Sequence, residues 1–383
     1  MTKTTNYDLK EKLVQYAPAK SEGLVEIDNA AVVFHRLKTI RTRSKPSTAK
    51  CNLDIYTLFL PTEPKYAGCN RLSEILGDVS HDSINRFLLR ERYQPKDLFD
   101  EIKQHIDLID GTLSGDDTVI DKPYSDPALT ELIGYFWSGK HHRVVKGIQL
   151  ITLYYTDPSG QSIPVNYRIY DKQEGKSKND YFREMIEEVI AWGLKPKIVT
   201  GDTWYSSQEN LKFLRNQKLG FIMGIAKNRK VSVQPGVYNQ VQELPIPDNG
   251  LVVHLKNFGR VKVFRKTFKN EVERYYIVLL PNSEEIEQLT YYDFKQLHSI
   301  HWGIECYHRA IKQLCGIERF MVRTTDALKT HFFCAIRAFT QLELMRAEDL
   351  IENWYELQRN LSLQIAREFI LAHLKQRMGL NTY

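Results

Sequence analysis

The spacing of apolar residues changes from a helical to a strand pattern near residue 110. Before that position, apolar residues recur every three to four positions in short runs, which is the spacing of one helix face. After it come short, mostly apolar runs that are bounded by Gly, Pro, Asn or Asp, as strands are. We therefore predict a helical region over residues 1–109 and an α/β region after it.

The α/β region begins with an ordered series of elements. Three strands come first, followed by a helix, a strand, a second helix and a fifth strand. These elements are predicted over residues 116–122, 146–157, 163–172, 179–193, 197–202, 207–217 and 220–227. A three-stranded meander followed by α, β, α and β is the element order of a ribonuclease-H-like core.

A basic, strand-rich segment interrupts this core before its last helix. From Lys227 to Asn270 there are nine Lys or Arg against two acids, so the segment would present cations such as Arg260 and Lys262 to a DNA backbone. We predict an α/β fold in four parts. They are a helical DNA-binding domain (1–109), the first part of the ribonuclease-H-like core (110–227), a β-strand insertion (228–292), and the final core helix with C-terminal helices (293–383).

The final core helix carries a polar stripe beside its apolar face. Glu305 lies seven residues after His298 and seven before Lys312, so the three side chains point in nearly the same direction. His301 lies one turn before Glu305 on the same side. A carboxylate flanked by cationic groups can hold a metal ion beside a phosphate, so this helix is the first candidate for the site.

Two further acids lie where strands of such a core would end or pair. Asp202 closes the apolar run before it, and Asp116 lies on the first predicted strand, with Asp117 and Asp121 as alternatives. Two divalent metals held by carboxylates can clamp the attacking and leaving oxygens of a phosphoryl transfer. We predict that Asp116, Asp202 and Glu305 ligate two Mg²⁺ ions, which Mn²⁺ could replace.

Composition limits the other classes of function. The chain has 383 residues, 42% of them hydrophobic and 26% charged, so it can form two or three globular domains. Its net charge of +6 allows an acidic partner such as DNA. No run of residues is long and apolar enough to cross a membrane, and the N-terminus lacks a secretion signal. We therefore expect a cytoplasmic protein without a membrane partner, associated with the nucleoid when bound to DNA.

The remaining local patterns are the cysteines and two segments that could bind DNA. The five cysteines are irregularly spaced, so we expect reduced thiols that pack in the core rather than a zinc site. A short helix over 71–77, a turn with Ser80 as N-cap and a helix over 81–93 have helix-turn-helix spacing. This unit is a candidate for DNA binding, as is the basic stretch over 35–50.

Several sequence blocks resemble a known family. DDTVIDKPYS, WSGKHHRVVKGI, IVTGDTWYSS and HWGIECYHRAIKQLCGIERF, within Asp116 to Arg323, are similar to DDE transposases of the bacterial insertion-sequence-four superfamily. The likeness is closest to its seven-hundred-and-one group, common in cyanobacteria. The resemblance implies a ribonuclease-H-like catalytic domain, Mg²⁺, and double-stranded DNA as partner, both as element ends and as target. It also implies a homodimer in the DNA complex.

The resemblance carries over to individual residues. The family's Tyr, Arg, Glu and Lys signature would fall on His298, His301, Glu305 and Lys312, of which only the last two match in type. Lys312 and the two histidines, with Arg309, would contact DNA phosphates, and the Asp-x-Thr spacing favours Asp116 over Asp117. Relatives can place an insertion aromatic against a flipped base, and Phe258, Phe264, Phe268 and Tyr275 are the candidates here.

We therefore predict a DNA transposase that cuts the ends of its own insertion sequence and joins them to target DNA. Two alternatives remain at this point. One is a ribonuclease-H-like nuclease that cuts without joining, which would use the same three acids. The other is a non-catalytic DNA-binding regulator derived from a transposase, which would have no need of the acids.

Overall fold

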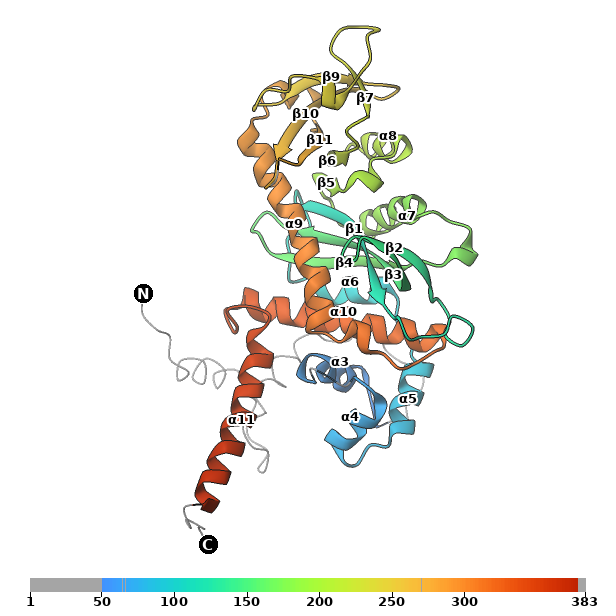
Figure 1. Cartoon of the computed structure of the whole chain (residues 1–383), viewed down its shortest axis with the longest axis vertical. Coiled ribbons are helices and arrows are strands. Elements are labelled where there is room, and N and C mark those ends of the chain that lie inside the picture. The colour runs from blue at the N-terminus through green and yellow to red at the C-terminus, as the bar shows by residue number, and fades with distance from the viewer. Residues whose placement is uncertain (1–49, 64, 66, 270, 378–383) are drawn as a thin grey trace. The chain divides into compact units, whose positions relative to one another are not determined.

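A computed structural model describes residues 50–63, 65, 67–269 and 271–377 (Figure 1). The chain divides into two compact units. One, the helical unit, comprises Met1–Tyr93 and Arg309–Tyr383, and the other, the sheet unit, comprises Gln94–His308. The basic stretch over 35–50 lies, except for Lys50, outside the described residues.

The helical unit is built around one long buried helix. That helix, α10 (Thr325–Ala347), is buried along most of its length and packs against α3 (Leu53–Thr62) and α5 (His81–Arg90). The unit also contains α4 (Cys69–Leu76) and α11 (Glu356–Arg377). Ser80 caps α5 by accepting from the Ser83 amide, and Ile84, Phe87 and Leu88 point inward. The two short helices predicted around this turn are therefore present.

The sheet unit contains an 11-stranded sheet whose first part has the expected core order. The strands β4, β3, β1, β5 and β6 lie side by side, with β3 antiparallel to β4 and β1, and β5 parallel to β1 and β6. Their bounds are β1 Thr112–Asp121, β3 Arg143–Thr156, β4 Ser162–Ile169, β5 Ile198–Gly201 and β6 Gly220–Ile225. The helices of this part are α6 (Pro95–Ile102), α7 (Lys178–Ala191) and α8 (Gln208–Asn216). This is a mixed α/β fold, as predicted.

The first strand begins earlier than its apolar pattern indicates. β1 starts at Thr112, and the small, polar residues before Asp116 are buried within it. A Cβ at Gly115 would lie 2.4 Å from Phe182 of α7, so the absent side chain makes room for that ring. A strand that was not predicted, β2 (Gly134–Ser138), pairs with the start of β3.

The strands of the 228–292 segment continue the same sheet. They are β7 (Lys230–Ser232), β8 (Asn239–Gln240), β9 (Leu251–Leu255), β10 (Gly259–Thr267) and β11 (Glu273–Leu279), and β11 pairs antiparallel with β6 (Figure 1). Phe264 of β10 stacks on Phe294 at a ring distance of 4.7 Å. Phe294 lies near the start of α9 (Tyr291–Gln313), the helix that carries Glu305. The hydrophobic core under these strands therefore holds the beginning of the glutamate helix.

Candidate metal centre

Asp116 and Asp202 lie side by side at one end of the parallel pair β1 and β5. The register aligns Gly115 with Gly201, and each acid is the next residue of the chain after one of these glycines. Asp202 directly follows β5 and caps a short 3-10 helix (Thr203–Tyr205) by accepting a hydrogen bond of 2.9 Å from the Trp204 amide. One of its carboxylate oxygens is thus held by the backbone.

A layer of hydrogen-bonded polar residues shows which sheet face α9 covers. Thr200 donates from its Oγ1 to the Oγ of Ser114 at 2.8 Å, and the same Oγ1 lies 2.9 Å from Nδ1 of His301 on α9. Thr200 and Ser114 each precede one of the two aspartates by two residues, which returns to the same strand face. Because His301 precedes Glu305 by about one helical turn, α9 brings Glu305 to the face that bears Asp116.

Asp116, Glu305 and His308 form a cluster on this face. One ligand atom from each lies within 4.8 Å of the others, with Asp116 and His308 buried and Glu305 exposed. The Nδ1 of His308 is 3.6 Å from Oδ2 of Asp116. The structure therefore brings two of the three predicted acids together with a histidine.

The electrostatics of this cluster favour a cation. Burial, followed by the negative charges of Asp202, Asp117 and Glu305, raises the pKa of Asp116 well above its usual value. Desolvation by the surrounding protein atoms and the charge of Asp117 raise the pKa of Asp202 as well. Carboxylates that disfavour one another's charge are relieved when a divalent cation binds between them. The oxygen and nitrogen donors present fit such a cation.

The two alternatives to Asp116 have other partners. Asp117 points to the opposite sheet face, where it accepts hydrogen bonds of 2.8 Å from Lys178 and from the hydroxyl of Tyr205. Asp121 lies five residues along the strand, about 17 Å from Asp116 at the usual rise, and its Oδ2 is 2.7 Å from Nε2 of His141. The structure does not bring either residue to the cluster.

The two histidines of the polar stripe are partly buried, and both have hydrogen-bonding partners within the sheet unit. His298 has its Nε2 3.0 Å from the hydroxyl of Tyr276 and its Nδ1 3.2 Å from the ammonium group of Lys266. Burial lowers the pKa of His298 to about 4, with Lys266 adding to the effect, and burial alone lowers the pKa of His301 to about 4. Both imidazoles are therefore neutral near pH 7.

The basic residues predicted to contact DNA differ in exposure. Lys262 is buried, and its ammonium group donates to the backbone carbonyls of Glu287 and Leu289. Arg260 is exposed and paired with Glu287. Within the helical unit, Lys312 lies 3.6 Å from Glu318, and Arg309 is exposed on α9. Of the insertion aromatics, Phe258, Phe264 and Tyr275 are buried.

Acid should destabilise the sheet unit between about pH 6.5 and pH 4 through His301. Its pKa falls from 6.5 to about 4 on folding. Between these pH values the unfolded chain therefore binds a proton at His301 and the folded protein does not. The contribution of the neutral His301 to the free energy of unfolding is fully present above pH 6.5 and is lost as the pH falls toward 4. We expect His301→Gln to remove about 1 to 2 kcal/mol of the difference in unfolding free energy between pH 7.5 and pH 5. Urea unfolding at both pH values measures it, and an unchanged difference would contradict the assignment.

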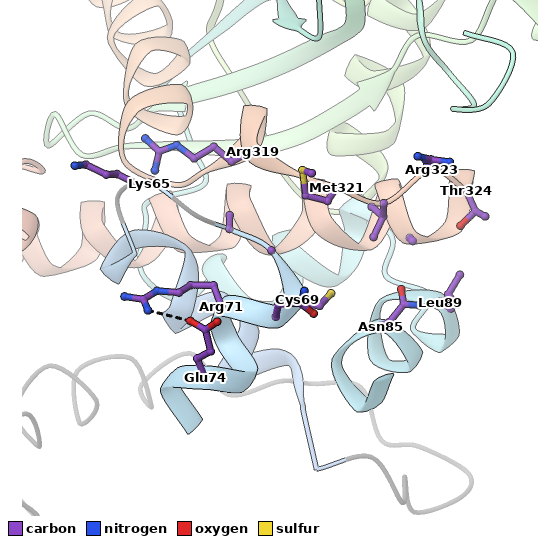
Figure 2. A pocket seen from close by; sticks show the side chains of 15 residues that line it. Lys65, Cys69, Arg71, Glu74, Asn85, Leu89, Arg319, Met321, Arg323 and Thr324 are labelled. Atoms are coloured by element: carbon purple, nitrogen blue, oxygen red, sulfur yellow. Dashed lines mark hydrogen bonds and ion pairs between the residues drawn. The ribbon is translucent and has the colours of Figure 1, made fainter. Parts of the chain in front are cut away.

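The helical unit has a pocket of about 940 Å³ between α4, α5 and the segment before α10 (Figure 2). Figure 2 shows the side chains of Lys65, Arg319, Met321 and Arg323 at its wall. Arg71 also lines it and is paired with Glu74 and Glu63. Met321 is 78% exposed, and Arg323 is exposed too. The wall is thus basic, with an exposed apolar side chain.

Sequence reasoning did not assign His308 to the site. Its imidazole is buried, as that of a core residue would be. The available signal was its position three residues after Glu305, which is one helical turn along the same face.

The cysteines are all free thiols: Cys51, Cys69, Cys306, Cys315 and Cys334. In the described part of the chain, no helix combines the length and apolarity needed to cross a membrane.

Comparisons with known proteins give the family of the chain and a structure of similar fold. The family described as transposase DDE domain matches residues 109–340. Among solved structures, the piggyBac transposase synaptic complex with hairpin DNA has a TM-score of 0.50 at 10% identity, with 96% of this chain and 77% of that chain covered. This match supports a ribonuclease-H-like core.

No curated protein matches the chain by sequence. Two further solved structures match less well. The Drosophila P element transposase strand transfer complex gives a TM-score of 0.27 at 10% identity, covering 62% of this chain and 55% of that one. The NurA nuclease of Sulfolobus solfataricus gives 0.22 at 10% identity, with 73% and 95% covered. Because the family match spans more than half of the sequence, the chain belongs to the transposase DDE domain family.

Proposed function

We propose that this transposase cuts the ends of its own insertion sequence and joins them to target DNA by two-metal phosphoryl transfer. The observation that carries the proposal is the meeting of Asp116 and Glu305 beside Asp202, on elements far apart in the sequence. The sequence blocks further support membership of the insertion-sequence-four superfamily and its seven-hundred-and-one group.

In the proposed mechanism, Asp116, Asp202 and Glu305 hold two divalent cations, Mg²⁺ or Mn²⁺. When bound, such cations activate an attacking oxygen and stabilise the leaving oxygen of a phosphodiester. The protein's part is to hold the three carboxylates in place before DNA arrives. The bonds of Asp117 to Lys178 and Tyr205 fix the strand from its opposite face, and the Trp204 amide fixes Asp202.

The proposed DNA contacts include three cationic side chains, of which two are exposed. Arg309 and Arg260 are exposed, and Lys312 lies on the same helix stripe as Glu305. His298 and His301, being neutral near pH 7, would act as hydrogen-bonding groups that position α9 rather than as charges. We leave Lys262 out of the proposed contacts because its ammonium group is committed to two carbonyls.

The basic pocket of the helical unit should bind DNA backbone. Arg323→Glu is expected to weaken duplex binding by about 10-fold or more at low salt and to reduce the salt dependence of binding. A matched control is Lys329→Glu, which makes the same change in charge at an exposed position of α10. Lys329 follows the pocket-lining Ala327 by two residues, about 200° around the helix. Fluorescence anisotropy measures both, and equal weakening would remove the pocket from the interface.

A strand-joining assay tests the proposed function. The protein is incubated with Mg²⁺, labelled DNA carrying the terminal repeats that flank its own gene, and an unlabelled plasmid. The proposal predicts label covalently joined to the plasmid. Cut ends without joined product would indicate the nuclease alternative, and bound but uncut DNA would indicate the regulator.

Because joining two ends needs two active sites, we also propose a homodimer in the DNA complex.

A further inference from the structure

We propose that His308 is a nitrogen ligand of the cation held between Asp116 and Glu305, and that the centre therefore selects Mn²⁺ over Mg²⁺. The inference rests on the proposed function, because it assumes that these two acids bind a metal. It adds a fourth residue to the three predicted from the sequence and changes the expected preference for the ion.

The backbone places His308 beside the two acids. It lies three residues after Glu305 within α9, so the two side chains share one helix face. Across from them, Asp116 lies on β1, whose partner strand β3 contributes Tyr154. The ring of Tyr154 stacks on that of Tyr307 at 5.2 Å. This stacking fixes the turn of α9 that carries His308 against the sheet.

The distances fit shared ligation better than a direct bond between the side chains. The Nδ1 of His308 is 3.6 Å from Oδ2 of Asp116, which is longer than a hydrogen bond. Two atoms bound to one cation at about 2.1 Å would be about 3 Å apart at right angles and about 4.2 Å apart when opposite. The 3.6 Å separation lies within this range, and the 4.8 Å limit on the whole cluster is slightly above it.

The side chains of His308 and Asp116 are both shielded from solvent. The His308 side chain is 5% exposed and that of Asp116 is 11% exposed, so bulk water has little access to either. A cation between them would satisfy the carboxylate, whose pKa is raised by burial and by its acidic neighbours. Glu305, which is exposed, would complete the set from the open side.

The donor set determines the preferred ion. Mg²⁺ takes oxygen ligands and demands a nearly regular octahedron, and it retains several waters. A nitrogen donor instead favours transition metals, whose affinity rises along the series that begins with Mn²⁺. Two carboxylates with one imidazole therefore form a site at which Mn²⁺ should bind at least about 10-fold more tightly than Mg²⁺.

The test measures nitrogen coordination directly. Full-length protein is freed of metal with a chelator, one equivalent of Mn²⁺ is added, and pulsed electron paramagnetic resonance records ¹⁴N modulation. We expect modulation in the wild type, its loss in His308→Gln, and its retention in His254→Ala, which removes an exposed histidine of β9. The glutamine approximates the size of the imidazole, and circular dichroism verifies the fold of each variant. The ratio of Mn²⁺ to Mg²⁺ affinity should fall at least about 10-fold in His308→Gln.

Asp116→Asn separates failure of this inference from failure of the proposed function. Should Mn²⁺ bind in an Asp116-dependent way without ¹⁴N modulation, or with modulation that survives His308→Gln, the histidine is no ligand and the acidic centre stands. Should Mn²⁺ fail to bind, or bind equally well to Asp116→Asn, the metal centre itself is wrong, and the inference fails with it.

Discussion

Replacing Asp116 with Asn should reduce DNA strand cleavage by at least about 1,000-fold. The asparagine keeps the size of the side chain and removes the charge that would hold a cation between β1 and α9. The metal-free variant should resist urea at least as well as the wild type, since the charges of Asp202, Asp117 and Glu305 disfavour an ionised group at this position. Lost activity with unreduced stability is the signature of a functional rather than a structural acid.

Asp121→Asn is the matched control for this prediction. It makes the same chemical change on the same strand, at a residue that pairs with His141 and Lys140 instead of the cluster. Cleavage should change less than about 3-fold, because removing such a partly exposed pair costs little stability. A large loss in Asp121→Asn, with normal cleavage by Asp116→Asn, would show that the site uses the other acid.

Phe294→Ala should lower the free energy of unfolding of the sheet unit by about 3 to 5 kcal/mol. Phe294 is buried in a cluster with Phe264, Ile222 and Val278, and its ring stacks on that of Phe264. The change leaves a cavity where the strands of the 228–292 segment meet α9. Because α9 also carries Glu305, Mn²⁺ binding should weaken together with stability. Urea unfolding measures the first effect and metal titration the second.

The control for this variant is Tyr292→Ala, two residues earlier on the same helix. Tyr292 is 67% exposed, so its removal should change the unfolding free energy by no more than about 0.5 kcal/mol. A loss below about 1 kcal/mol for Phe294→Ala would mean that the aromatic stack does not anchor the helix.

The order of the core elements could be predicted because each has a strong local signal. Strands such as 146–157 are apolar runs, and the turn before α5 has Ser80, a good N-cap that bonds to the Ser83 amide. The stripe of α9 was predictable for the same reason, since its spacing follows the helical period. The membership of the chain in the transposase DDE domain family agrees with the resemblance of its sequence blocks.

Features that depend on tertiary packing could not be predicted from the sequence. The start of β1 is polar and small, and it is a strand because Ser114 bonds to Thr200 and Gly115 makes room for Phe182. Lys262 has the same alternation as Arg260, yet its ammonium group is covered by the backbone near Glu287. His308 could be seen to follow Glu305, but only the pairing of β1 with β5 and the packing of α9 place it beside Asp116.

Anomalous diffraction from crystals of the full chain grown with Mn²⁺ tests the central claim most directly. The account predicts an anomalous peak bonded to carboxylate oxygens of Asp116 and Glu305, with Asp202 beside it, and loss of that peak in Asp116→Asn. A map with no peak among these three acids, or one in which Glu305 lies on the opposite face of the sheet from Asp202, would contradict it.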